Sequence, residues 1–170
     1  LYCAGGVRSA AAAETLAGLG YTNLTSMAGG INGWSAAGLP VVETTSLTPE
    51  QKSRYSRHLL LPGVGADGQT KLLNSRVLMV GAGGLGAPAA LYLAAAGVGK
   101  LRIIDFDSVE ASNLQRQVIH TTDRVGMLKV ESAATQIRAL NPDVEVEPIN
   151  GMLTTENVAS LLDGVDLVID

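Results

Sequence analysis

The chain has 170 residues, 46% of them hydrophobic, which is enough for one core or parts of two and too apolar for a disordered chain. Its 12 basic and 16 acidic residues give a net charge of −4, which argues against nucleic acid or an anionic membrane surface as the main partner. One cysteine excludes an internal disulfide framework and an all-cysteine metal cluster. We expect a cytoplasmic protein without a membrane span, and the start at Leu1 indicates a fragment of a longer chain.

Residues 1–44 form a small, glycine-rich first block in which Cys3 is the reactive candidate. Residues 1–2 are predicted to end a strand, and residues 4–8 to form a loop into a helix capped by Ser9. Successive N–H groups in such a loop, with the helix dipole and a nearby arginine, lower a thiol pKa and stabilise a thiolate or persulfide. The alternative is a cysteine packed as a small hydrophobic residue.

A polar stretch predicts a linker over residues 45–50, after which a second block covers residues 51–170. Thr48 suits an N-cap, Pro49 the first helical position, and Gln51 completes a capping box. We therefore expect a helix to begin directly after Thr48.

Strands and helices alternate through the second block, and Gly97 and Asn141 are expected to end two of the helices. This alternation predicts an α/β fold, a Rossmann-like parallel sheet with helices on both faces, preceded by a partial α/β domain in the first block. The expected strands cover residues 77–80, 101–105, 144–148 and 166–170, and the expected helices cover residues 85–96, 127–140 and 154–162.

A strand that runs into a glycine-rich turn is the clearest motif of the chain. The apolar residues 77–80 are followed by a turn that contains Gly81, Gly83 and Gly86. These glycines let the backbone turn tightly and approach a pyrophosphate, while the N–H groups at the start of the next helix face the anion. The motif predicts a nucleotide site but does not define a reaction.

Polar side chains follow the second strand. Asp105 stands at its end, where a carboxylate accepts the ribose hydroxyls of adenosine in ATP or NAD, and a turn-capping aspartate is the alternative. Asp107 fits the same ribose or caps the turn. Arg116 and Lys129 come next, and their cations suit the charge that grows as pyrophosphate leaves, whereas solvated surface charges are the alternative.

The histidines and two arginines carry weaker signals. His58 and His120 lack metal-ligand spacing, so we expect ordinary surface or half-buried histidines and no metal site. Arg54 and Arg57 lie one turn apart on an expected helix, where an exposed basic face is the simplest interpretation.

Two family resemblances rest on these residues. The first block resembles the C-terminal part of a rhodanese domain, which implies that Cys3 forms a persulfide. The second block resembles the MoeB/ThiF family of ubiquitin-activating-like adenylyltransferases from about residue 47 onward. The motifs of the first block are Cys3 to Ser9, Ala28 to Trp34 and Gly38 to Val41, and those of the second are Arg54 to His58, Leu61 to Gly63, Gly81 to Gly86, Asp105 to Asp107, Ser112 to Gln117, Gly126 and Lys129.

The second resemblance implies ATP-dependent adenylation of the C-terminal glycine of a ubiquitin-like sulfur carrier, with sulfur from the rhodanese persulfide, as in molybdopterin or thiamin synthesis. It implies that Gly84 lies against the adenosine and phosphates, and that Asp105 binds the ribose. Arg57 corresponds to an arginine that reaches across a homodimer. The implied nucleotide-binding residues of the polar segment are Ser112, Asn113, Arg116 and Lys129.

The family pattern extends past this sequence. It places a magnesium-binding aspartate a few residues after the fourth strand, which is beyond Asp170, together with a later carrier-docking sheet. We therefore expect this fragment to be inactive alone. Three other functions remain open: an NAD(P)-dependent oxidoreductase, a non-catalytic carrier-binding scaffold, and a cyclic-tRNA-modifying relative of the same family.

Overall fold

The computed structural model describes residues 1–40 and 47–170. The chain divides into two compact units, Leu1–Thr44 and Thr45–Asp170. Part of the predicted linker, residues 45–46, lies outside the described residues, as do residues 41–44 of the predicted first domain.

The first unit contains two helices within residues 1–40, α1 (Val7–Gly18) and α2 (Gly30–Ala36). The prediction of Ser9 as a helix cap is wrong. Gly6 is the N-cap, with a φ of 87° that favours glycine, so α1 begins two residues before Ser9. The predicted strand end at residues 1–2 is also wrong, because the described residues supply no neighbouring strand for it to pair with.

Three helices precede the sheet in the second unit: α3 (Pro49–Arg54), α4 (Ser56–Leu59) and α5 (Gly65–Asn74). The capping box predicted at Thr48 is confirmed, since its side chain accepts from the Gln51 N–H and the Gln51 side chain accepts from the Thr48 N–H. The expected single helix for Arg54 and Arg57 is wrong. Tyr55 separates α3 from α4, because its ring is buried in the interior of the second unit.

The parallel sheet has the strand order β3-β2-β1-β4, and helices connect its strands. This confirms the predicted Rossmann-like α/β fold, with boundaries that differ by a few residues. Gly97, with φ 83°, and Asn141 end their helices as predicted. The strands are β1 (Arg76–Val80), β2 (Lys100–Asp105), β3 (Glu145–Asn150) and β4 (Leu167–Ile169); the elements between them are α6 (Gly86–Ala96), η1 (Ala111–Asn113), η2 (Thr122–Arg124), α7 (Lys129–Leu140) and α8 (Val158–Leu162).

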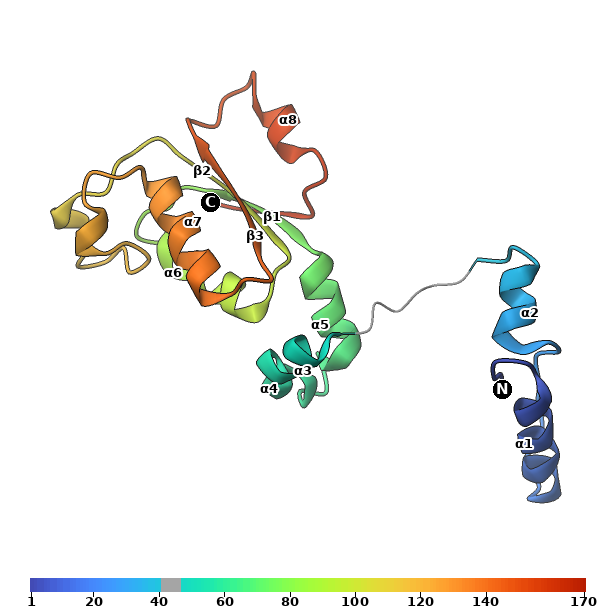
Figure 1. Cartoon of the computed structure of the whole chain (residues 1–170). Coiled ribbons are helices and arrows are strands. Elements are labelled where there is room, and N and C mark those ends of the chain that lie inside the picture. The colour runs from blue at the N-terminus through green and yellow to red at the C-terminus, as the bar shows by residue number, and fades with distance from the viewer. Residues whose placement is uncertain (41–46) are drawn as a thin grey trace. The chain divides into compact units, whose positions relative to one another are not determined.

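Helices cover both faces of the sheet, α6 and α7 on one and α8 on the other (Figure 1). Alternate residues of one strand point to opposite faces. Accordingly, Val77 and Met79 of β1 join the larger apolar cluster with α6 and α7, whereas Leu78 joins Ile104 and Leu161 under α8. The two clusters hold the strands in register, so the carboxyl ends of β1, β2 and β3 meet at one edge.

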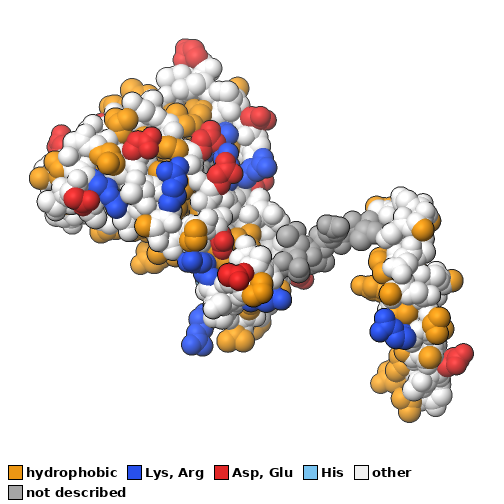
Figure 2. All heavy atoms as spheres, viewed as in Figure 1, with side chains coloured by type: hydrophobic (Ala, Val, Ile, Leu, Met, Phe, Trp, Pro, Cys, Tyr) orange, Lys and Arg blue, Asp and Glu red, His pale blue; other side chains and the backbone are white. Residues whose placement is uncertain are grey.

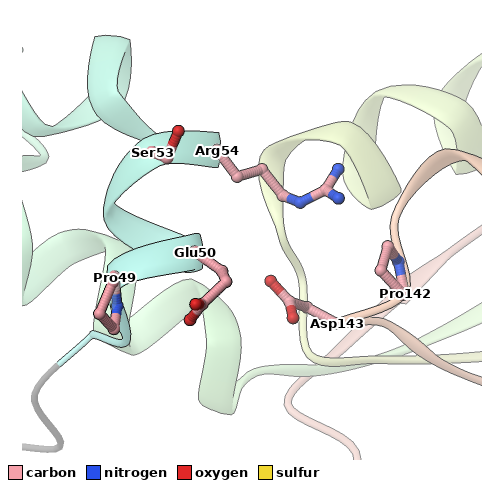
Figure 3. Close-up of a pocket in the computed structure, with 6 residues that line it drawn as sticks. All are labelled: Pro49, Glu50, Ser53, Arg54, Pro142 and Asp143. Carbon is pink, nitrogen blue, oxygen red and sulfur yellow. The ribbon is translucent and has the colours of Figure 1, made fainter.

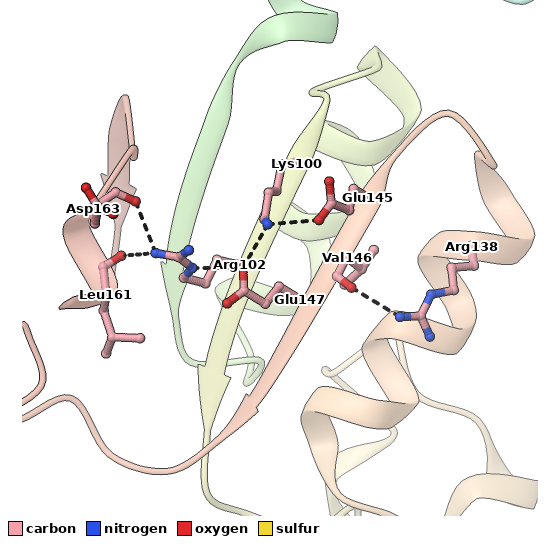
Figure 4. Close-up of polar contacts among 8 residues, drawn as sticks. All are labelled: Lys100, Arg102, Arg138, Glu145, Val146, Glu147, Leu161 and Asp163. Atoms are coloured by element: carbon pink, nitrogen blue, oxygen red, sulfur yellow. Dashed lines mark hydrogen bonds and ion pairs between the residues drawn. The ribbon is translucent and has the colours of Figure 1, made fainter.

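Ion pairs between β2 and β3, and a hydrogen bond from β2 to α8, lie near the start of the strands (Figure 4). Lys100 on β2 pairs with Glu145 and Glu147 on β3, at 2.8 and 2.9 Å. Arg102 pairs with Glu147 at 3.1 Å and donates to the Leu161 carbonyl oxygen at the end of α8. This network is well separated along the strands from the residues that the sequence marks as functional.

The described surface of the second unit mixes acidic and basic side chains on the face seen in Figure 2. Among the described residues, none of the helices has the length and apolar character that crossing a membrane would require.

Candidate functional site

The glycine turn after β1 is compact and open on one side. Gly81 has a φ of 94° and donates its N–H to the Ile104 carbonyl oxygen at 2.8 Å. A Cβ at Gly86 would overlap the Gly81 carbonyl oxygen, so only glycine lets α6 start so close to the strand. Within residues 1–40 and 47–170, the N–H groups of Gly83 and Gly84 have no hydrogen-bond partner. They are free to bind an anion.

Asp105 joins this turn to the end of β2. Its Oδ2 accepts from the Ala82 N–H and its Oδ1 from the Asp107 N–H, both at 2.8 Å. The structure thus places Asp105 as a turn-stabilising carboxylate, which was the alternative interpretation. Each oxygen keeps a second acceptor position, so a ribose hydroxyl can still bind here.

The polar segment after β2 crosses over the glycine turn. A Cβ added at Gly84 would lie 3.7 Å from the Arg116 Cδ, and one at Gly83 would lie 3.8 Å from the Gln117 Nε2. Arg116 is exposed and donates from Nη1 to the Ser112 carbonyl oxygen at 3.2 Å. The Arg116 side chain therefore lies over Gly84, and the Gln117 amide lies over Gly83.

Ser112 and Asn113 are occupied within their own turn. The Ser112 hydroxyl donates to Glu110 Oε2 at 3.0 Å, and the Glu110 N–H donates to the Asn113 Oδ1 at 3.2 Å. Both side chains therefore shape the segment that carries Arg116.

Lys129 stands at the start of α7 and is almost fully buried. Its Nζ lies 2.7 Å from Asp107 Oδ2, with only 7% of the Lys129 side chain exposed. The Lys129 N–H also donates to the Asp107 carbonyl oxygen at 2.9 Å. The Asp107 N–H in turn donates to the Asp105 carboxylate, so the Lys129 ammonium group is linked through Asp107 to the turn at the end of β2.

Two buried polar residues of the site, Gln117 and His120, were not predicted from the sequence as site residues. Gln117 is 4% exposed, and its Oε1 has no hydrogen-bond partner in the part of the chain that the structure describes. His120 is 5% exposed, which corrects the expectation of a surface or half-buried histidine. Burial lowers the pKa of His120, so its ring is neutral near pH 7. Their position in a polar, non-periodic segment gave no sign of burial.

A pocket of about 270 Å³ opens beside Asp105 at the carboxyl ends of the strands. It lies where doubly wound sheets bind nucleotides, and its walls combine polar loop backbone with apolar side chains. Its lining includes Gly81, Asp105, Phe106, Met152 and Leu153.

A wider hollow of about 960 Å³ lies between α3 and the residues that precede β3 (Figure 3). Arg54 at its rim donates to the Leu140 carbonyl oxygen, and Asp143 accepts from the Tyr55 hydroxyl. This hollow borders the edge where the strands begin, opposite Asp105, and its charged groups have structural partners. We therefore place the candidate site at the smaller pocket.

Arg57 is not brought to the glycine turn. It is exposed on α4, next to Tyr55, whose ring packs against Gly97 near the amino ends of the strands. Within one copy of the chain, the structure therefore leaves Arg57 apart from the other predicted site residues.

Cys3 lies in the first unit, in a loop that presents hydrogen-bond donors to its sulfur. The Gly6 N–H donates to Cys3 Sγ at 3.1 Å. The polar groups of Ser9, followed by the backbone N–H groups of Gly6 and Arg8, lower the pKa of Cys3 from 9.0 to about 6. The thiol is therefore largely a thiolate at pH 7.

The second unit is thus a doubly wound parallel α/β domain with an anion-accepting turn at the carboxyl ends of its strands. The chain belongs to the ThiF family, whose model matches residues 55–170. Residues 1–37 match the Rhodanese-like domain. Both matches agree with the resemblances drawn from the motifs.

Named relatives match about three quarters of this chain. The SAMP-activating enzyme E1 of Haloferax volcanii is 56% identical over 127 residues, which are 75% of this chain and 47% of that protein. The probable adenylyltransferase/sulfurtransferase MoeZ of Mycobacterium tuberculosis is 52% identical over 132 residues, which are 77% of this chain and 34% of that protein.

A solved structure shows the same fold. The E. coli tRNA N6-threonylcarbamoyladenosine dehydratase TcdA, in complex with ATP, superposes with a TM-score of 0.69 and 31% identity, covering 74% of this chain and 51% of that one. The present chain therefore spans about half or less of the length of these relatives.

Proposed function

We propose that residues 51–170 bind ATP and adenylate the C-terminal glycine of a ubiquitin-like sulfur carrier protein, and that residues 1–44 supply sulfur through Cys3. The observation that carries the proposal is the pair of unpaired N–H groups at Gly83 and Gly84, with the Arg116 side chain over Gly84 and the pocket at Asp105 nearby. The names of the relatives, adenylyltransferase/sulfurtransferase and SAMP-activating enzyme E1, support the same activity.

The adenylation step follows from the charges at this edge. A carboxylate oxygen of the carrier attacks the α-phosphorus of ATP, and the bond from that phosphorus to the bridging oxygen breaks as pyrophosphate leaves. Negative charge grows on the leaving oxygens, so preorganised cations stabilise the transition state. Arg116 offers a forked donor and Lys129 a point charge for these oxygens, while Asp105 accepts from the ribose.

Lys129 is paired with Asp107 in the structure, with its Nζ 2.7 Å from Asp107 Oδ2. To contact the phosphates directly, the ammonium group would have to leave this carboxylate. The buried ion pair also fixes the loop that carries Asp105.

The described residues contain no group of three or more His, Cys, Asp or Glu side chains that could hold a metal by itself. Because Mg²⁺ at nucleotide sites is usually held by one or two carboxylates together with phosphate oxygens, magnesium would bind here together with ATP. The aspartate expected after Asp170 stays a prediction. In this proposal the groups of the described chain that neutralise the phosphates are Arg116 and Lys129.

Sulfur transfer would use the loop at Cys3. Its low pKa makes the sulfur a nucleophile near pH 7, and the Gly6 N–H stabilises negative charge on it. The rhodanese-like match supports this half of the proposal and favours sulfur-carrier activation over tRNA modification. Replacing Cys3 with Ala should abolish thiolation of the carrier and leave its adenylation intact.

We further propose a homodimer in which Arg57 serves the partner's nucleotide. The Arg57 side chain is exposed and forms no hydrogen bond or ion pair with any residue that the structure describes. Apolar side chains that follow Arg57 in the chain, and others just before and within α6, are also exposed, as at a subunit interface. They are Leu60, Leu61, Leu85 and Tyr92.

Complementation tests the homodimer. An Arg57→Ala chain and an Arg116→Ala chain, each impaired alone, would form mixed dimers with one intact site if Arg57 acts across the interface. Equal mixing would then restore about a quarter of wild-type activity. No restoration would place Arg57 in its own chain's site or outside the reaction.

Carrier-dependent ATP–pyrophosphate exchange tests the main proposal in the complete protein that contains this chain. Arg116→Ala should cost about 3 kcal/mol of transition-state stabilisation, or roughly a hundredfold in rate. Lys71→Ala, which removes an exposed cation on α5, is the matched control and should exchange normally. A wild-type rate for Arg116→Ala would refute its role, and saturable NAD binding without competition by ATP would favour an oxidoreductase.

A further inference from the structure

His120 is a buried polar residue that the proposed reaction does not use. Its ring lies between the glycine turn and α7, with Nε2 3.1 Å from the Ala82 carbonyl oxygen and Nδ1 2.9 Å from the Ser132 Oγ. Ser132 is fully buried as well. Both ring nitrogens therefore have partners, which indicates one fixed orientation of the imidazole.

The partners define which nitrogen carries the proton. A carbonyl oxygen only accepts hydrogen bonds, so Nε2 must be the donor toward Ala82. Nδ1 then accepts from the Ser132 hydroxyl. Burial and the charges of Lys129 and Arg124 oppose a second proton on the ring, while Asp105 favours it. The neutral ring is thus a directional donor aimed at the turn.

This donor fixes the direction of one peptide plane. In a trans peptide the C=O and the N–H point in opposite directions, and the structure has no cis peptide among the described residues. Because His120 holds the Ala82 oxygen on the buried side, the Gly83 N–H points the other way. The preceding plane is fixed too, since the Ala82 N–H donates to Asp105 at 2.8 Å.

We propose that His120 is a positioning residue that presents the Gly83 amide to the phosphates of the bound nucleotide. The inference rests on the proposed nucleotide site and adds a residue to it. The Gly83 N–H has no partner among the described residues, so without the His120 bond the peptide plane between Ala82 and Gly83 can rotate. Rotation would turn a carbonyl oxygen toward the phosphates and repel them.

Matched substitutions test the geometry in the intact chain. The amide nitrogen of Gln can take the place of Nε2, whereas that of Asn takes the place of Nδ1. His120→Ala and His120→Asn should therefore weaken ATP binding about tenfold, and His120→Gln should retain it. Ser132→Ala keeps the bond to Ala82 and should also bind ATP normally. Calorimetry measures ATP and adenosine binding for each variant.

Adenosine separates positioning from general damage, because it lacks phosphates. Adenosine affinity should stay within about twofold of wild type in every variant, since the pocket at Asp105 is unchanged. Equal losses for adenosine and ATP, or normal ATP binding by His120→Ala and His120→Asn, would overturn the inference. A wild-type chain that binds neither ligand would instead refute the proposed function.

A measurement on the wild-type chain keeps the inference testable if His120→Ala and His120→Asn do not fold. In an NMR titration, ATP should move the Gly83 amide proton, because phosphate oxygens become its acceptors, and adenosine should not. A Gly83 amide that responds equally to both ligands, or to neither while ATP binds, would contradict the proposal.

Discussion

The two candidate sites of this chain are built in different ways. At Cys3 the contacts are local, since Gly6 and Ser9 lie three and six residues along the chain. At the glycine turn they are long-range: Ala82 donates to Asp105, 23 residues away, and accepts from His120, 38 residues away. The contacts to the sulfur come from one loop, which α2 holds through the Ile31 N–H to the Cys3 carbonyl oxygen at 2.9 Å, whereas the second site depends on the packing of the whole sheet. Substitutions should therefore act locally in the first unit and broadly in the second.

Two glycine substitutions give the largest expected contrast. A Cβ at Gly86 would overlap the Gly81 carbonyl oxygen, whereas one at Gly18 in α1 has no atom within 4 Å. Gly86→Ala should lower the free energy of unfolding by about 3 kcal/mol and abolish ATP binding, because α6 must move from the strand. Gly18→Ala should leave stability equal or higher by up to about 1 kcal/mol.

Segment-resolved hydrogen exchange during denaturation measures both substitutions. Protection in β1, β2 and α6 should fall together in Gly86→Ala. Loss confined to residues next to Gly86 would show that the second site is as local as the first.

The buried ion pair offers the next largest effect. Asp107→Ala would leave the Lys129 ammonium group, 7% exposed, without its partner. We expect a loss of about 2 kcal/mol of stability, less than for a fully buried pair because Asp107 is 49% exposed. Lys129→Met removes the charge itself and should be close to neutral for stability while it weakens ATP binding. Chemical denaturation of both variants checks this, and equal destabilisation would mean that packing rather than charge dominates.

The same contrast explains what sequence reasoning could achieve. Features fixed by neighbouring residues were predictable, such as the capping box at Thr48 and the helix end at Gly97. The order of strands and helices also followed from periodicity. By contrast, α5 was missed, because Gly65 and Gly68 lower its helix propensity and its position depends on the contact of Gly99 with Leu73.

The residues of the candidate site show the same difference between local and long-range contacts. The glycine turn and Asp105 were visible as a motif, but the roles of Gln117 and His120 were not. Their burial is decided by how the segment between β2 and α7 folds over the turn, and that segment has no periodic pattern. Ser9 was misassigned for the opposite reason, because a local capping preference gave way to the left-handed backbone at Gly6.

The pH dependence of Cys3 tests the local site. With a pKa lowered to about 6, the thiolate forms as pH rises through 6, so alkylation by iodoacetamide should be near its plateau at pH 7 and fall below pH 6. Ser9→Ala removes a hydroxyl that stabilises the thiolate and leaves the Ser9 N–H. The pKa then rises, and the rate at pH 6 should drop about fivefold.

Thr15→Ala is the matched control, since its hydroxyl donates to the Ala11 carbonyl oxygen within α1. It should not move the alkylation profile. If Ser9→Ala also changed the unfolding of residues 47–170, the contrast between the two sites would be wrong, because a substitution at the Cys3 site would then affect the second unit.

The smallest effect is expected at Gln117, where one substitution should raise the free energy of unfolding and lower the affinity for ATP. Its buried Oε1 has no partner among the described residues, and an unsatisfied buried acceptor costs free energy. Gln117→Met keeps the length of the side chain and removes that acceptor, so the chain should gain about 1 kcal/mol of stability. Denaturant unfolding measures the gain. If bound ATP forms a hydrogen bond with the Gln117 amide, the same variant should bind ATP more weakly, because methionine cannot form this bond. A stabilised variant with wild-type ATP affinity would show that the buried amide belongs to packing and not to the site.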